Sequence, residues 1–463
     1  MNTTLSRLIP ALLVCLSLAA CTASASETPL VPDTLPPTDV PAASATPPSS
    51  VTQPSVETPL VPVALLKSEQ ERLMHPVVPP EAQQALVSGN NAFALDLYQA
   101  LSQAQHGNLF YSPYSISLAL AMTYAGARGE TEAQMAHALH FDLPQESLHA
   151  AFNRLDLDLA SSGQSSGNTQ PLQLNIANAV WAQMDFPFLP AYLDLLAHNY
   201  GAGIYLADFV NQADRVVEEI NRWVSDQTEE KIQDILSPGA LDAMTRMVLA
   251  NAIYFKAAWN DQFDIDNTQP APFYLLDGSE VQVDMMSGEM RLPYLRGEDY
   301  QAVELRYSGM TAAMDIILPD EGQFAAFEAG LDWPAVEAIL AGLDTTLVQL
   351  SMPKFTFRSQ FSLADTLAGL GMPSAFDGGA ADFSGMDGQR DLYIGDIIHQ
   401  AFVAVDEEGT EAAAATIVIF EVTSIEPTGE IIQLTIDRPF IFLIRDLNSG
   451  QILFFGRVLN PGQ

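Results

Sequence analysis

The chain has 463 residues, of which 57 are acidic and 19 basic, and its formal net charge is −38. This acidity weighs against nucleic-acid binding, because phosphate contacts need clustered Lys and Arg, and it indicates a soluble, self-repelling surface. The two cysteines, Cys15 and Cys21, both lie near the N-terminus, so no disulfide framework holds the body of the protein and the fold must depend on its apolar core.

The N-terminus has the features of an export signal. One basic residue, Arg7, precedes an apolar run that is too short for a comfortable membrane span. The run ends in "LAAC", which resembles the lipobox of bacterial lipoproteins, where the cysteine is lipidated and becomes the first mature residue. We therefore expect residues 1–20 to be a lipoprotein signal peptide and Cys21 to anchor the protein to the outer face of the cell membrane. The alternative is an ordinary signal peptide and a secreted protein.

Residues 21–85 are expected to form a tether. From Thr22 to about Val63 the composition shifts to Pro, Thr, Ser, Ala and Val, and "SETPLVP" at 26–32 recurs as "VETPLVP" at 56–62. This stretch has no Lys or Arg and few large apolar residues, so it cannot bury a core and should be extended and semi-rigid. It would hold the domain formed by residues 86–463 away from a membrane surface.

Globular patterning begins near Val87, first with helices. "NAFALDLYQALSQ" (91–103) places its large apolar residues on one helical face, and "SPYSISLALAMTYAGA" predicts a buried helix with Ser112 as N-cap and Pro113 in its first turn. Further helical patterns lie at 131–139, 146–155, 189–201 and 213–228.

The second half of the chain turns to strands. Strand patterns lie at 247–259, 300–307, 312–319, 346–357, 399–406, 431–436, 440–446 and 451–458. Helices first and strands later, with few βαβ alternations, predict an α+β fold with large antiparallel or mixed sheets. No internal repeat or linker divides this region, so we expect one unusually large domain.

No catalytic constellation is found. The sequence lacks HExxH, GxSxG, Walker A and CxxC motifs. His137 and His140 can share a helix face, but no Glu or Cys cluster accompanies them, so an ordinary surface helix is favoured over a metal site. Neither an enzyme, nor a metal, nor a cofactor is predicted.

His399 lies on a strand of mostly apolar residues. A buried imidazole needs a hydrogen-bond partner. Ser112, Ser115 and Asn251 also lie within apolar segments and are candidate partners. We expect a core histidine here rather than a catalytic base.

The stretch "GTEAAAAT" (409–416) combines opposite preferences. Its alanines favour helix, whereas the "IVIF" that follows at 417–420 favours strand. The segment is therefore either a helix-to-strand boundary or a segment that exists in two states.

Several segments together resemble the serpin family, and the resemblance covers about Val87 to Pro461. The segments are "NLFYSPYSISLALAMTYAGARGETEAQM" (108–135), "ANAIYFKAAWNDQF" (250–263), "SMPKFTFRSQFSLADTLAGLGMPSAF" (351–376), "ADFSGM" (381–386), "DEEGTEAAAAT" (406–416) and "DRPFIFLIRDLNSGQILFFGRVLNP" (437–461). Their order and spacing make the match highly specific. It implies a fold of three β-sheets with eight or nine helices and an exposed reactive-centre loop.

The resemblance also implies a mechanism. A target serine protease cleaves the reactive loop and is held as a covalent acyl-enzyme, while the N-terminal part of the loop inserts into the central sheet and releases stored strain. We expect the protein to act as a monomer and to need no cofactor, since its few basic residues disfavour a heparin-like activator. The alternative is a non-inhibitory serpin-fold protein that binds or chaperones.

The resemblance assigns the hinge of the loop. The hinge residues are Glu408, Gly409, Thr410, Glu411, Ala412, Ala413, Ala414, Ala415 and Thr416. A central strand tolerates no proline, and none occurs from Thr410 until Pro427. The even-numbered residues from Thr410 to Phe420 are all small or apolar and suit a buried face, so the two-state interpretation is favoured. A large or charged residue at Thr410 would obstruct insertion.

The resemblance also assigns residues that control the opening of the central sheet and have no catalytic role. Ser112, Ser115, Asn251 and His399 match the polar cluster under the central sheet where its strands part. Trp259 matches the tryptophan near the point of first loop entry.

Family spacing from the hinge places the reactive bond at Thr423-Ser424, with Val422-Thr423 as its competitor. The chain has about five more residues after this bond than well-known members. No Lys or Arg occurs between Asp406 and Asp437, which disfavours trypsin-like targets. Small β-branched residues at the bond suit elastase-like or subtilisin-like proteases, and nearby glutamates leave a glutamate-preferring protease open.

Overall fold

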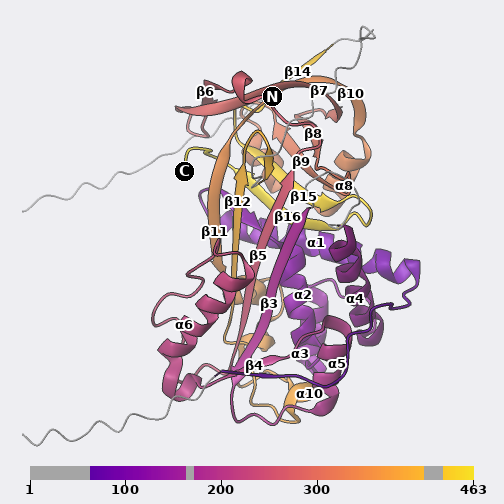
Figure 1. The fold of residues 1–463 in the computed structure, drawn as a ribbon, viewed down its shortest axis with the longest axis vertical. Coiled ribbons are helices and arrows are strands. Elements are labelled where there is room, and N and C mark those ends of the chain that lie inside the picture. The colour runs from indigo at the N-terminus through magenta and orange to yellow at the C-terminus, as the bar shows by residue number, and fades with distance from the viewer. Residues whose placement is uncertain (1–62, 163–171, 411–430) are drawn as a thin grey trace, which may run out of the picture. The chain divides into compact units, whose positions relative to one another are not determined.

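The computed structural model describes residues 63–162, 172–410 and 431–463. All of them belong to one compact unit, Leu60–Gln463. They form an α+β fold, as expected (Figure 1). The helices are α1 Pro80–Ala104, α2 Pro113–Tyr124, α3 Gly129–Ala138, α4 Gln145–Ser162, α5 Pro190–Tyr200, α6 Phe209–Gln227, α7 Phe324–Ala329, α8 Trp333–Ala341, α9 Ala364–Gly369 and α10 Ser384–Asp387, with short 3-10 turns at Ile265–Asn267 and Pro373–Phe376.

The strands form two hydrogen-bonded sheets. In chain order they are β1 Ala64–Leu66, β2 Leu109–Tyr111, β3 Gln173–Gln183, β4 Ile204–Ala207, β5 Met247–Ala258, β6 Gln269–Tyr274, β7 Glu280–Arg296, β8 Tyr300–Arg306, β9 Ala312–Pro319, β10 Asp344–Pro353, β11 Phe355–Ser362, β12 Asp396–Val405, β13 Gly409–Thr410, β14 Ile432–Thr435, β15 Phe440–Asp446 and β16 Ile452–Val458. The seven-stranded sheet has the order β1-β4-β3-β5-β13-β12-β11, and β5 also pairs with β12. The nine-stranded sheet has the order β14-β10-β7-β8-β9-β15-β16-β2, with β6 on β7.

The expected three sheets therefore appear as two, because the long strand β7 belongs to both parts of the larger sheet. Its first residues pair with β6, its middle with β10 and its last residues with β8. The helix count also differs. Ten α-helices occur among the described residues instead of eight or nine, and three of them, α7, α9 and α10, have six residues or fewer.

Alternate residues of the seven-stranded sheet face two different cores. On β5, Val248, Ala250 and Ala252 pack with α6, whereas Leu249 and Ile253 pack with the main core, to which α2 belongs. This period of two is what a strand buried on both faces requires. The two helices therefore cover opposite faces of the sheet, whose central strands run side by side in Figure 1.

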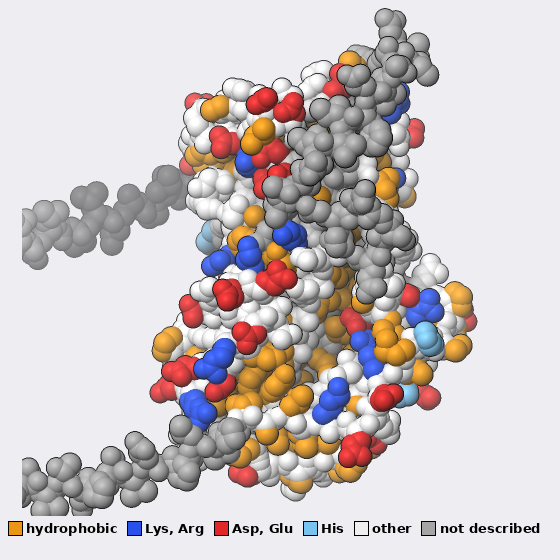
Figure 2. Space-filling view, viewed as in Figure 1, with side chains coloured by type: hydrophobic (Ala, Val, Ile, Leu, Met, Phe, Trp, Pro, Cys, Tyr) orange, Lys and Arg blue, Asp and Glu red, His pale blue; other side chains and the backbone are white. Residues whose placement is uncertain are grey.

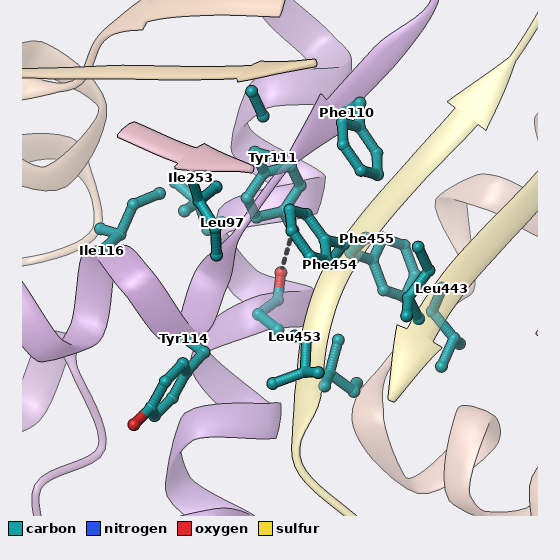
Figure 3. Close-up of a cluster of buried hydrophobic side chains, with 14 of the residues drawn as sticks. Leu97, Phe110, Tyr111, Tyr114, Ile116, Ile253, Leu443, Leu453, Phe454 and Phe455 are labelled. Atoms are coloured by element: carbon teal, nitrogen blue, oxygen red, sulfur yellow. Dashed lines mark hydrogen bonds between the residues drawn. The ribbon is translucent and has the colours of Figure 1, made fainter. Parts of the chain in front are cut away.

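The main core is rich in aromatic side chains where β2 meets β16. Phe110 stacks on Phe454 with ring centroids 4.9 Å apart, and the rings of the neighbouring Tyr111 and Phe455 are tilted by 46° with centroids 6.5 Å apart (Figure 3). Directly after β2, Ser112 caps α2: its Oγ accepts a hydrogen bond from Ser115 N at 3.2 Å. The predicted N-cap is confirmed, and it fixes where α2 begins beneath the sheet.

Ordered structure begins earlier than composition suggested. The end of the expected tether includes β1, which pairs with β4, and α1 begins at Pro80 rather than near Val87. Arg72 binds Asp156 at 2.7 Å and Asn153 at 2.8 Å, so this stretch is held by specific contacts rather than by a large apolar surface. Among the described helices, none is both long enough and apolar enough to span a bilayer.

Candidate functional site

The seven-stranded sheet is closed at one end and parted at the other. β5 and β12 pair directly, in parallel, from Val248 and Asp396 as far as Ile253 and Ala401. Beyond that point no pairing joins the remaining residues of these two described strands. Instead β13, formed by Gly409 and Thr410, enters between them and pairs antiparallel with both. The two residues therefore begin a new central strand where the sheet opens.

A buried polar cluster lies at the closed end, on the face that packs against α2. Asn251 and His399 are direct partners across β5 and β12, and the Asn251 Oδ1 atom binds His399 Nδ1. Asn251 Nδ2 donates to Ser115 Oγ at 2.8 Å and to Asn178 Oδ1. Ser112 N donates to His399 Nε2 at 3.0 Å. The structure thus brings Ser112, Ser115, Asn251 and His399 together.

His399 is fully buried and uncharged. Because Nε2 accepts from the Ser112 amide, Nδ1 carries the proton and donates to Asn251 Oδ1. Burial lowers the pKa of His399 from 6.5 to about 3, although the Asn251 hydrogen bond acts in the opposite direction. An imidazole sealed in this way cannot reach a substrate, so the arrangement can tie strands together but cannot act as a general base on a bound molecule.

Asn178 of β3 completes the cluster and was not predicted. It is the register partner of Asn251, and its Nδ2 donates to Ser115 O at 3.2 Å. A signal existed in the sequence: "ANAV" at 177–180 parallels "ANAI" at 250–253, with the same polar residue set among apolar ones. Two asparagines at matching positions of neighbouring strands would have indicated a shared polar site.

The parted end is lined by aromatic residues. Thr410 is 1% exposed, and its Oγ1 forms a hydrogen bond of 2.7 Å with Tyr307 Oη. Tyr307 stacks on Trp259 with ring centroids 4.7 Å apart and an interplanar angle of 10°. Trp259 in turn donates from Nε1 to Asp406 O at 3.0 Å and from its amide to Glu408 O at 2.8 Å. Trp259 therefore contacts the turn at Asp406–Glu408 that leads into β13.

Gly409 is required by close backbone approach. A Cβ atom on it would lie 2.1 Å from Ala257 O, a distance that no side chain tolerates. Its amide and that of Glu408 both donate to Asp406 Oδ1, at 3.2 and 2.9 Å, which forms the tight turn leading into β13. The glycine therefore lets the hinge lie directly against β5.

A charged anchor lies just before this turn. Lys354 Nζ binds Glu407 Oε2 at 2.8 Å, and Thr268 Oγ1 donates to Glu407 Oε1 at 2.7 Å. Burial of Glu407 opposes ionisation, yet these two hydrogen bonds hold the pKa of its carboxyl below the usual range. Sequence reasoning missed Lys354, Thr268 and Tyr307, because each comes from a different strand or loop and carries no local motif.

The remaining sequence-predicted residues lie outside the described residues. They are Cys21, the hinge residues Glu411, Ala412, Ala413, Ala414, Ala415 and Thr416, and the reactive-bond candidates Val422, Thr423 and Ser424. Of the histidine pair, His137 is in α3 and His140 Nε2 binds Asp96 Oδ2 at 2.7 Å. Within the described ranges, no group of three His, Cys, Asp or Glu side chains is arranged to hold a metal ion.

Comparisons with known proteins agree on one family. The serpin (serine protease inhibitor) family pattern matches residues 88–461. Leukocyte elastase inhibitor A of Mus musculus is 38% identical over 390 residues, covering 81% of this chain and 99% of that protein. A serpin-like protein of Thermococcus kodakarensis, itself uncharacterised, is also 38% identical, covering 81% of this chain and 86% of its own. The thermophilic serpin tengpin in its native state has a TM-score of 0.76 at 30% identity, covering 86% of this chain and 100% of that structure. The chain belongs to the serpin family.

Proposed function

We propose that the protein inhibits serine proteases as a suicide substrate. The protease's serine oxygen attacks the carbonyl carbon of Thr423 and the bond to the Ser424 nitrogen breaks. The serine's proton passes to the freed amine, which becomes the amino end of a fragment that β14, β15 and β16 hold in the nine-stranded sheet. The N-terminal part of the loop then inserts between β5 and β12 before the ester is hydrolysed. The observation that carries this proposal is β13, because its two residues already pair with both strands.

The observed register extends directly into the hinge. Thr410 is opposite Ala257 on β5 and Val405 on β12. Counting onward antiparallel to both strands, Thr416 would enter between Asn251 and His399, which are themselves partners across the closed end. The register against β5 and the register against β12 both place Thr416 at this pair, so one continuous strand can insert without a bulge. Thr416 would then separate the Asn251–His399 pair and offer its hydroxyl to both.

The same register separates buried from exposed residues. Thr410 faces the main core beside Ala257 and Val405, so the other even-numbered hinge residues would face the core as well. Glu411 would face the opposite side beside Lys256, a half-buried residue of β5 with the complementary charge. The alternation predicted from sequence and the geometry of β13 thus favour the same buried set.

We expect insertion of the hinge to be favourable in free energy. Each new backbone hydrogen bond contributes about 0.5–1.5 kcal/mol net, and each larger apolar side chain about 1.5–3 kcal/mol. For a strand of roughly ten residues the gross gain is on the order of 10–20 kcal/mol before ordering costs, which remove a large part. A remainder of several kcal/mol makes the trapped state effectively irreversible.

Elastase-like and subtilisin-like proteases are the targets that the loop sequence fits best. Val422 and Thr423 are small and β-branched, and the stretch from Glu407 to Ile436 contains no Lys or Arg. The similarity to leukocyte elastase inhibitors supports the same class of target. Incubation with an elastase-type and a subtilisin-type protease should give a covalent complex that survives SDS.

Two further readouts separate inhibition from a binding or chaperone role. The protein cleaved in its loop should melt at a higher temperature than the intact protein, because the inserted strand adds hydrogen bonds. Mass spectrometry of the C-terminal fragment, separated after denaturation, should show cleavage after Thr423. Clean cleavage without a complex, together with unchanged melting, would favour the non-inhibitory alternative.

We also propose that the protein is exported and lipidated at Cys21, on the basis of the "LAAC" motif. Metabolic labelling with palmitate should label the wild type, whereas a Cys21→Ser variant should carry no label. An unlabelled wild type would reduce the N-terminus to a plain secretion signal.

A further inference from the structure

A large groove lies apart from the buried cluster and the hinge. Its volume is about 770 Å³, which is within the range of ligand and peptide sites. Three segments that are distant in sequence form it: the turn after β6, the connection from β9 to α7, and the segment between β14 and β15. No motif in the sequence pointed to it, because each segment contributes only a few residues.

The groove has an apolar floor and a partly apolar rim. Phe324 is 5% exposed, and Pro319 and Pro439 are buried beside it. Tyr274 and Leu276 are 46% and 57% exposed, which is high for large apolar side chains. Exposed apolar side chains beside a concave surface are typical of protein–protein contact sites. In the view of Figure 2, orange and red side chains intermingle over the region of β6 and β7.

Two acidic residues of the groove form ion pairs with arginines, and a third is unpaired. Arg438 Nη1 donates to Asp437 Oδ1 at 2.9 Å, and Arg296 binds both carboxylate oxygens of Asp320 at 2.7 Å. Glu321, next to Asp320, is exposed and has no ion-pair partner within the described ranges. The groove therefore offers one free carboxylate near an exposed aromatic ring, in a chain whose net charge is −38.

The groove is connected to both anchors of the reactive loop. Thr268, which binds Glu407 at the hinge, directly precedes β6, and β6 ends at Tyr274. Six residues at 3.3 Å each place the groove roughly 20 Å along the sheet from the hinge. On the other side of the loop, Ile431 leads through β14 to Asp437, whose carbonyl accepts from Tyr274 N at 2.8 Å.

We propose that this groove is a secondary docking site for the target protease, and that it takes a Lys or Arg side chain flanked by apolar residues on the protease surface. The cation would lie over the Tyr274 ring and pair with the Glu321 carboxylate, while the apolar neighbours would rest on Leu276 and Phe324. A protease of about 230 residues has a radius of gyration of roughly 17 Å, which is comparable to the distance along β6 from the Glu407 anchor to the groove, so a protease bound near that anchor would reach the groove. The site would favour cationic proteases over neutral ones with the same preference at the cleaved bond.

This inference rests on the proposed function, so the test separates docking from trapping. Docking is measured as the reversible affinity for a cationic elastase-type protease whose catalytic serine is replaced by alanine. Glu321→Lys should weaken that affinity about three- to tenfold, and Tyr274→Ala about two- to fivefold, at low salt. Glu218→Lys, an equal change of charge on the exposed face of α6, should have no effect, and neither should Glu321→Lys at high salt.

Trapping is measured separately with the active protease. The groove variants should still form the SDS-stable complex, with the wild-type number of inhibitor molecules consumed per protease but a slower association rate. If both variants bind the inactive protease as tightly as the wild type, the docking site is overturned and the inhibitor function stands. If binding depends on the groove but no SDS-stable complex forms, the inhibitor function fails instead. If the wild type does not bind the inactive protease, the docking site is overturned, and the SDS-stable complex with the active protease alone decides the inhibitor function.

Discussion

Thr410→Arg tests the insertion mechanism at its first step. Thr410 is 1% exposed, faces the main core and binds Tyr307 Oη at 2.7 Å. An arginine there would have to bury its guanidinium beside Ala257, Val405 and the Tyr307 ring, where a hydroxyl now makes one hydrogen bond. Because β13 has only two residues, we expect the hinge to withdraw from the sheet in the intact variant, so the variant should fold.

The magnitude of the block follows from the cost of burying the charge. The lost hydroxyl contact costs about 0.5–1.5 kcal/mol, and an unpaired buried charge costs several kcal/mol more. A rise of about 3 kcal/mol in the insertion barrier slows insertion roughly a hundredfold. In the proposed mechanism the hydrolysis of the acyl-enzyme does not depend on residue 410, so hydrolysis should overtake insertion and the variant should become a substrate.

The assay follows the SDS-stable complex and the cleaved product as protease is titrated. Thr410→Ser keeps the hydroxyl and should inhibit like the wild type. Thr356→Arg places the same side chain at an exposed position of β11 in the same sheet and should also inhibit normally. If Thr410→Arg formed the complex with wild-type stoichiometry, insertion through this register would be refuted.

Three further predictions concern the ties that hold the sheet. Tyr307→Phe removes the hydrogen bond to Thr410 but keeps the stacking on Trp259, so the hinge should withdraw more easily and association with the protease should quicken about two- to tenfold in stopped-flow measurements. Glu407→Gln loses the charge that Lys354 and Thr268 stabilise, and the urea midpoint at pH 7 should fall by the equivalent of about 1 kcal/mol; because the folded pKa of Glu407 is lowered, the wild type should lose this advantage as the pH falls through that pKa. Burial lowers the pKa of His399 from 6.5 to about 3, so the unfolded state takes up the extra proton and stability falls as the pH drops from about 6.5 towards 3. His399→Gln should show a shallower fall in melting temperature between pH 7 and pH 4, and an identical slope would contradict the assignment.

Sequence patterns predicted helices and strands well where a single local signal, such as an apolar run or an N-cap residue, determines the element. β9 and β15 have the bounds that their apolar runs predicted, and Ser112 caps α2 as its type and position indicated. β3 was missed, because it lies in the helical half of the chain and its alanines and asparagines give a weak strand signal. β1 was missed for a different reason: three residues pairing with β4 leave no periodic pattern to detect.

Some residues of the candidate site could be predicted from the sequence and others could not. The polar residues that stand out within apolar segments, Asn251 and His399, were found from sequence, because burial of a polar group needs a partner. That they are direct partners could not be predicted, since the match depends on the register of β5 against β12. Tyr307 and Lys354 were missed because ordinary tyrosines and lysines become part of the site only through the tertiary fold.

The parted sheet also predicts how the cost of insertion is distributed along the hinge. Residues 254–256 of β5 and 402–404 of β12 are not paired with each other, so the three residues after Thr410 would enter without breaking any pairing. Ala414 would be the first to displace a pair, Ile253 with Ala401, and Thr416 would displace Asn251 from His399. From Ala414 onward, each displaced parallel pair is replaced by pairing on both sides of the new strand. In the proposed mechanism the barrier to insertion would therefore lie early, at the boundary between the unpaired and paired parts of β5 and β12. The small side chains at 412–415 suit that boundary, because they can enter with the least separation of β5 from β12.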